Sequence, residues 1–131
     1  MKFMLMMNAP RGDGDWGVMR WAHEDLRAHI AFMKGFAQDL AKAGELVSAE
    51  GLASPAQARI VRAGKASPEV TDGPFAESKE FLAGYWIVDV ESAAQAYEIA
   101  ARASAAPGPK GAPLNLAIEV REVMSAPPVD P

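Results

Sequence analysis

The stretch Phe-Leu-Ala-Gly-Tyr-Trp-Ile-Val-Asp-Val at residues 81–90 has the strongest β-strand pattern in the chain, and it decides the fold. Successive side chains of a strand point to opposite faces of a sheet. One face would carry Leu82, Gly84, Trp86, Val88 and Val90, and the other would carry Phe81, Ala83, Tyr85 and Ile87. Residues 2–8 show the same double-faced apolar pattern, which is typical of a central rather than an edge strand.

Two helices are expected to pack on this sheet. Apolar residues recur at steps of four and three between residues 24 and 43, the spacing of one helix face: Leu26, Ile30, Met33, Ala37 and Leu40. Acidic residues at its start and Lys42 in its last turn complement the helix dipole, and Gly44 is a typical stop. A second, alanine-rich helix runs from Glu91 and Ser92 to about residue 104, with Ala94, Tyr97 and Ala101 on one stripe.

Further strands are predicted at residues 45–49, 58–63, 69–71 and 114–124. The turn at Gly64 and Lys65 joins the second and third of these into a hairpin. The order is then strand, helix, strand, hairpin, strand, helix, strand. This is the order of an α+β, ferredoxin-like βαββαβ sandwich with an antiparallel sheet and an inserted β-hairpin. Residues 1–124 form a single domain in this interpretation, and residues 125–131 form a proline-rich C-terminal tail.

Two helices can cover only one face of such a sheet. Strands that are apolar on both faces leave the other face exposed, and single chains seldom tolerate an apolar surface of that size. We therefore expect a homodimer that packs face to face around a two-fold axis. Trp86 is expected in the core or at this interface.

Composition excludes several classes of function. The chain has 131 residues, no cysteine and a net charge of −4, so it offers no disulfide framework, thiolate metal site or cysteine nucleophile. The acidic balance argues against binding to nucleic acid or to an anionic membrane. Residues 1–65 carry nine basic and seven acidic groups, and residues 66–131 carry four and ten. The short apolar start fits a strand rather than a targeting segment, so we expect a cytoplasmic protein. No motif implies a cofactor or a metal.

The first helix carries the best candidate for a proton-transferring residue. Asp25 and His29 are four residues apart and share a helix face. A step of 100° per residue places His29 at the edge of the apolar stripe. A carboxylate beside an imidazole holds it in one tautomer, which leaves the other nitrogen to act as a base. The alternative is a half-buried histidine in a local helix salt bridge. His23 is more typical of a cap or a loop.

A second candidate segment precedes the strand at residues 81–90. Asp72, Glu77, Lys79 and Glu80 place four ionisable groups within nine residues, around the turn formers Gly73 and Pro74. One interpretation is a solvated turn. The other is that some of these side chains project into a pocket at the mouth of the sheet.

The same segment carries a resemblance to a known family. Residues 72–80 (DGPFAESKE) and the strand after them resemble the signature of the DGPF subgroup of YCII-related proteins. Residues 49–52 resemble the "GEGL" turn of that family, and residues 1–6 and 118–123 resemble its first and last strands. Ser78 stands where threonine is usual. The resemblance implies a dimeric α+β barrel and no particular reaction. Some such proteins are encoded beside extracytoplasmic-function sigma factors, and distant relatives use a His–Asp pair that does not align with either histidine here.

Two functional hypotheses follow. In the first, a pocket between the sheet and the helices binds a small polar organic molecule or performs proton transfer on it. His29, Asp25 and Asp72 would be catalytic, and Glu77, Lys79 and Trp86 would bind the ligand. In the second, the protein is a non-catalytic accessory or regulator, for example one linked to such a sigma factor, and acts through protein partners.

Overall fold

The computed structural model describes residues 1–10, 18–73 and 79–125. The predicted order of elements is confirmed, and the chain folds as a ferredoxin-like α+β sandwich. Its strands and helices are β1 (Lys2–Pro10), α1 (His23–Lys42), β2 (Leu46–Gly51), β3 (Arg59–Arg62), β4 (Glu69–Asp72), β5 (Glu80–Asp89), α2 (Ala93–Ser104) and β6 (Ile118–Glu122). Short 3₁₀ turns lie at η1 (Val18–Arg20), η2 (Pro55–Gln57) and η3 (Pro109–Gly111).

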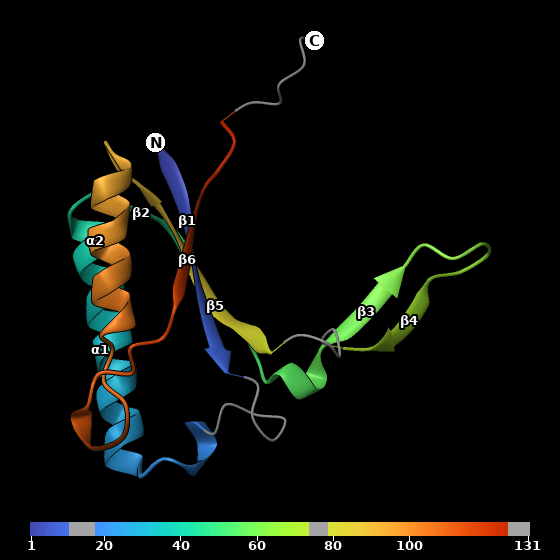
Figure 1. Cartoon of the computed structure of the whole chain (residues 1–131), viewed down its shortest axis with the longest axis horizontal. Helices are drawn as coiled ribbons and strands as arrows, with labels where there is room; N and C mark the ends of the chain where they lie inside the picture. The colour runs from blue at the N-terminus through green and yellow to red at the C-terminus, as the bar shows by residue number, and fades with distance from the viewer. Residues whose placement is uncertain (11–17, 74–78, 126–131) are drawn as a thin grey trace.

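The main sheet has the strand order β2-β5-β1-β6, and each neighbouring pair is antiparallel. The strands at residues 2–8 and 81–90, apolar on both faces, therefore lie at its centre. Both helices cover the same face of this sheet, and β3 and β4 form a separate two-stranded sheet that stands away from it (Figure 1).

The core lies between the sheet and the two helices. Alternate residues of β1 point into it, and Leu5 is fully buried there. On β5, Trp86 and Val88 lie opposite Leu5 and Phe3 and share their face. The aromatic ring of Phe36 on α1 meets the Trp86 ring edge to face, with centroids 5.6 Å apart. This contact joins the middle of the sheet to the first helix.

A β-bulge corrects the predicted faces of the strand at residues 81–90. The register passes from Met7 opposite Gly84 to Asn8 opposite Leu82, so Ala83 is an extra residue in β5. The alternation shifts by one position there. Phe81 is consequently buried, and Leu82 is only half-buried, which reverses the faces expected for these two residues.

Two further details differ from the sequence prediction. The buried stripe of α2 is Ala96, Ile99, Ala100 and Ala103, whereas Ala94, Tyr97 and Ala101 are exposed. Several stripes of an alanine-rich helix have helical spacing, and the one that contains the branched Ile99 faces the core. The last strand is also shorter than 114–124. The backbone amides of Leu114 and Asn115 donate to the carbonyls of Ala106 and Ser104 rather than to the sheet.

The other face of the sheet carries no helix. Register places the half-buried side chains of Met4 and Met6 on this side, together with those of Tyr85 and Ile87 on the neighbouring strand. On the edge strands the same face carries Glu50 and Glu119, both exposed. We call this surface the open face. Its centre is apolar, and its edges carry the acidic Glu50 and Glu119 and the basic Arg121, which lies opposite Met4.

Candidate functional site

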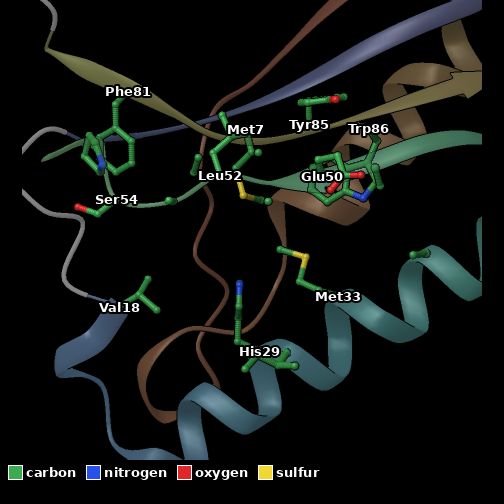
Figure 2. Close-up of a pocket in the computed structure, with 18 of the residues that line it drawn as sticks. Met7, Val18, His29, Met33, Glu50, Leu52, Ser54, Phe81, Tyr85 and Trp86 are labelled. Atoms are coloured by element: carbon green, nitrogen blue, oxygen red, sulfur yellow. The ribbon is translucent and has the colours of Figure 1, made fainter. Parts of the chain in front are cut away.

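A cavity of about 570 Å³ lies between α1 and the half of the sheet formed by β2 and β5. The segment that follows β2, from Leu52 to Pro55, and Val18 of η1 also line it. In Figure 2, His29 and Met33 rise from α1 on one side, and Met7, Leu52 and Phe81 lie across the space from them. Most of the wall is apolar. This is the size and the chemistry of a small-molecule pocket.

The helix wall of the cavity is the apolar stripe predicted from the sequence. Leu26, Ile30, Met33 and Ala37 all line the cavity, while Leu40, at the end of the stripe, is buried in the core. Four of the five stripe residues therefore border the cavity. The spacing identified the inward side of α1 correctly. Most of that side faces the cavity rather than packed side chains.

Two glycines shape the sheet wall. Gly51 of β2 lies directly opposite Gly84 of β5, and both line the cavity. A Cβ atom at Gly84 would lie 2.8 Å from the carbonyl oxygen of Glu50, so the backbones approach too closely for a side chain there. A Cβ atom at Gly51 would meet nothing within 4 Å. The cavity thus extends to the backbone of β2, where any larger residue would fill it.

His29 is the buried polar side chain in this wall, with 7% of its surface exposed. Its Nδ1 lies 3.0 Å from the carbonyl oxygen of Pro107, in the loop after α2. A carbonyl only accepts, so Nδ1 carries a proton and donates it in this hydrogen bond. The Trp21 ring packs edge-on against the imidazole, with centroids 5.4 Å apart. The ring is therefore held in a defined orientation from two sides.

The other ring nitrogen of His29 faces the cavity. Figure 2 shows the ring standing up from α1 with a nitrogen at its far end, directed into the space between the walls. Nδ1 is adjacent to the ring carbon that bears the side chain, so the nitrogen at the far end is Nε2. With Nδ1 protonated and the ring neutral, Nε2 is a hydrogen-bond acceptor and a base.

The polar residues Glu50 and Tyr85 contribute differently from His29. They pair across β2 and β5, one position away from the Ala49–Trp86 pair that faces the helices. Side-chain alternation directs Glu50 and Tyr85 toward the open face, although both residues line the cavity. The hydroxyl of Ser54, at the cavity mouth, accepts a hydrogen bond of 3.2 Å from the backbone amide of Ala56.

The structure brings together only part of the predicted site. His29 and Trp86 both line the cavity. Asp25 is half-buried on α1 outside the cavity lining, and the group that orients the His29 ring through Nδ1 is Pro107 rather than this carboxylate. Asp72 lies at the end of β4, with its side chain 94% exposed and 3.7 Å from the Arg59 guanidinium. Lys79 is exposed outside the lining, and Glu77 lies outside the described residues.

Sequence reasoning did not identify several cavity residues. Leu52, Ser54 and Pro55 come from the segment after β2, whose path depends on the tertiary fold. One glycine gave a usable signal. Glycine inside a strand often marks a close approach of backbone or ligand, and Gly84 interrupts the strand pattern of residues 81–90.

The described ranges hold no candidate metal site and no candidate membrane-spanning helix. They contain no group of three or more His, Cys, Asp or Glu side chains placed to hold a metal ion. Within the same ranges, no helix is both long and apolar enough to cross a membrane.

Comparison with known proteins gives one result. The family model described as the YCII-related domain matches residues 1–112, which includes every element except β6. A search of curated proteins found no match to the chain.

Proposed function

The chain belongs to the YCII-related family, and on that premise we propose that it is a cytoplasmic ligand-binding protein whose cavity holds a small, largely apolar organic molecule. His29 is the polar anchor of this ligand. The observation that carries the proposal is a buried imidazole, fixed through Nδ1, in the wall of an otherwise apolar cavity of about 570 Å³.

The walls define the body of the ligand. Pockets of about 300–1,000 Å³ enclose molecules of the size of metabolites and drugs. Met7 and Met33 are flexible thioethers that pack well against aromatic rings, and Phe81 and Trp86 offer ring surfaces. An aromatic or branched aliphatic body fits these walls better than the polar molecule expected from the sequence.

Nε2 of His29 defines the polar group of the ligand. As an acceptor, it pairs with a hydroxyl or an N–H of the ligand and disfavours a carboxylate, which has no proton to offer. An acceptor nitrogen of this kind also takes a proton from a bound acid, so general-base chemistry is the reaction that the site permits. The carboxylates Asp25 and Asp72 lie outside the cavity lining, and strand alternation directs the side chain of Glu50 toward the open face, so we assign this chemistry to the imidazole.

The test uses three naphthalene probes that differ in one group: 2-naphthol, 2-methoxynaphthalene and 2-naphthoate. Binding is measured by thermal stabilisation and by NMR titration. At equal probe concentrations we expect 2-naphthol to stabilise the protein most. A concentration of 100 times its Kd corresponds to a stabilisation of about 2.7 kcal/mol. The methoxy compound should bind more weakly, and naphthoate should bind least.

Matched variants identify the binding site. Asparagine places its amide nitrogen near the position of Nδ1, so His29→Asn retains a donor to Pro107 and removes Nε2. It should abolish the preference for 2-naphthol over the methoxy compound. His23→Asn is the control, because His23 is exposed on the same helix outside the cavity lining. Gly51→Leu should fill the cavity and remove binding of all three probes. Unchanged binding in Gly51→Leu would place the ligand elsewhere.

We also infer that two chains pair through the open face. Its apolar centre is the surface that a second sheet would bury, as the strand pattern predicts. The alternative function, a non-catalytic regulator that acts through protein partners, requires no ligand. Failure of the wild-type chain to bind any small molecule from a broad library would favour that alternative.

A further inference from the structure

The hairpin of β3 and β4 forms an arm, which we define as residues 59–72. It pairs with no other strand of the described chain and stands off the body on the side of the main sheet opposite the helices (Figure 1). The open face looks toward the same side. A second sheet seated on the open face would therefore lie on the same side of the molecule as the arm.

The arm exposes an apolar cross-strand pair. Val61 and Val70 lie directly opposite each other in the antiparallel register, and they are 60% and 58% exposed. A two-stranded hairpin is marginally stable by itself in water and usually needs a further layer to pack against. Within the described chain nothing covers these two side chains. They form a small exposed apolar surface that a partner could cover.

The two ends of the arm are held together at its base. The backbone amide of Gly73 donates a 2.9 Å hydrogen bond to the carbonyl of Ala58, which closes the hairpin where it leaves the body. A Cβ atom at Gly73 would lie 3.2 Å from the side chain of Ile60 and 3.3 Å from the backbone of Ala58. The antiparallel pairing of the arm therefore continues to the residues that flank it.

Charge distinguishes the arm from the rest of the chain. Three basic residues, Arg59, Arg62 and Lys65, stand against two acidic ones, Glu69 and Asp72, so the net charge of the arm is +1. The remaining residues contain 10 basic and 15 acidic groups and have a net charge of −5. The body of a second copy is therefore an electrostatically favourable partner for the arm.

We propose that the arm packs against a second copy of this chain that is seated on the open face. Val61 and Val70 contact the body of that copy. In a two-fold dimer the contact occurs twice, since each chain supplies one arm and receives one. The proposal rests on the pairing through the open face inferred above and adds the surface that completes it.

The test measures the dimer dissociation constant by sedimentation equilibrium. The double variant Val61→Ser/Val70→Ser should raise it at least tenfold. In an armless variant, the dipeptide Asn-Gly replaces residues 59–72. Ala58 and Gly73 then become the first and last residues of a four-residue turn, which retains their hydrogen bond. We expect this variant to raise the constant further. Tyr97→Ser is the control, because Tyr97 is 59% exposed on α2, on the helix side of the sheet.

The variants distinguish the contribution of the arm to dimerisation from that of the open face. Ile87→Asp, on the open face, should yield monomers. If Ile87→Asp is monomeric while the armless and double-serine variants dimerise as tightly as wild type, the arm has no part in pairing and this proposal is wrong. If the wild-type chain is monomeric at millimolar concentration, the open-face pairing is wrong as well. Far-UV circular dichroism and 2-naphthol binding confirm that each variant is folded.

Discussion

His29 acquires its chemistry from a residue that is 78 positions away in the chain. The helical periodicity of residues 24–43 placed His29 at the edge of the apolar stripe, and this placement was possible because helix geometry is local. The hydrogen bond from Nδ1 to Pro107 depends on where the loop after α2 passes. No local pattern encodes that path, so the sequence suggested Asp25, the nearest carboxylate on the helix, in its place.

Replacing two of the glycines with alanine should change the free energy of unfolding in opposite directions. Gly35, inside α1, would place a Cβ atom in open space, so Gly35→Ala should stabilise the fold by about 0.5–1 kcal/mol through helix propensity. Gly84→Ala would bring Cβ to 2.8 Å from the Glu50 carbonyl oxygen and should destabilise the fold by about 1–3 kcal/mol. Urea unfolding measures both. A Gly84→Ala variant as stable as wild type would contradict the close approach of β2 and β5.

At the scale of the elements, the two helices begin in different ways. Ser92 caps α2: its hydroxyl accepts from the amide of Gln95, and the Gln95 side chain accepts from the amide of Glu91. Ala22 precedes α1 and provides no side-chain cap. One helix thus begins with a cap of the kind that stabilises N-termini, and the longer helix lacks one.

This difference predicts opposite effects of two substitutions. Ser92→Ala should lower the free energy of unfolding by about 1 kcal/mol, because it leaves the Gln95 amide without its acceptor. Ala22→Ser should raise it by about 0.5–1 kcal/mol, because the backbone before α1 is already extended, with φ −57° and ψ 144°. Thermal and urea unfolding report both changes. Equal stabilities of Ala22→Ser and wild type would show that water satisfies the first amides of α1 equally well.

The helices and strands were largely predictable from the sequence. The bulge in β5 and the early end of β6 were not. Strand and helix periodicity gave the element order, the hairpin and the inward side of α1. The bulge at Ala83 arises from register against β1, and the shortened β6 arises from hydrogen bonds to Ala106 and Ser104. Both are pairing choices between distant segments. Periodicity also cannot distinguish a stripe that meets packed side chains from one that borders a cavity, and the stripe of α1 does both.

At the scale of the whole molecule, neighbouring residues of β5 have opposite surroundings. Trp86 is buried against Phe36, beneath the helices, whereas Ile87 is half-buried on the open face. The sequence left Trp86 between core and interface, and the structure places it in the core and the cavity wall. Ile87 is the residue whose surroundings the proposed pairing of two chains would change.

Placing a carboxylate at each position tests this division. Trp86→Asp buries a charge without a partner and removes an aromatic ring from the core. The expected loss is about 3–5 kcal/mol or more, enough to unfold a domain of ordinary stability. Ile87→Asp should leave a folded monomer, because its carboxylate stays in contact with water. Circular dichroism and sedimentation distinguish the two results. A folded Trp86→Asp protein would contradict the buried position.

The hydrogen bond between Ala58 and Gly73 has a consequence for how this chain tolerates change in length. Because this bond joins the two ends of residues 59–72, we expect that the segment between them can be exchanged without breaking it. The loop between β3 and β4, at the outer end of the arm in Figure 1, offers a place for a label or a grafted peptide away from the helices and the main sheet. A change in the length or sequence of this segment should therefore leave the cavity walls unchanged.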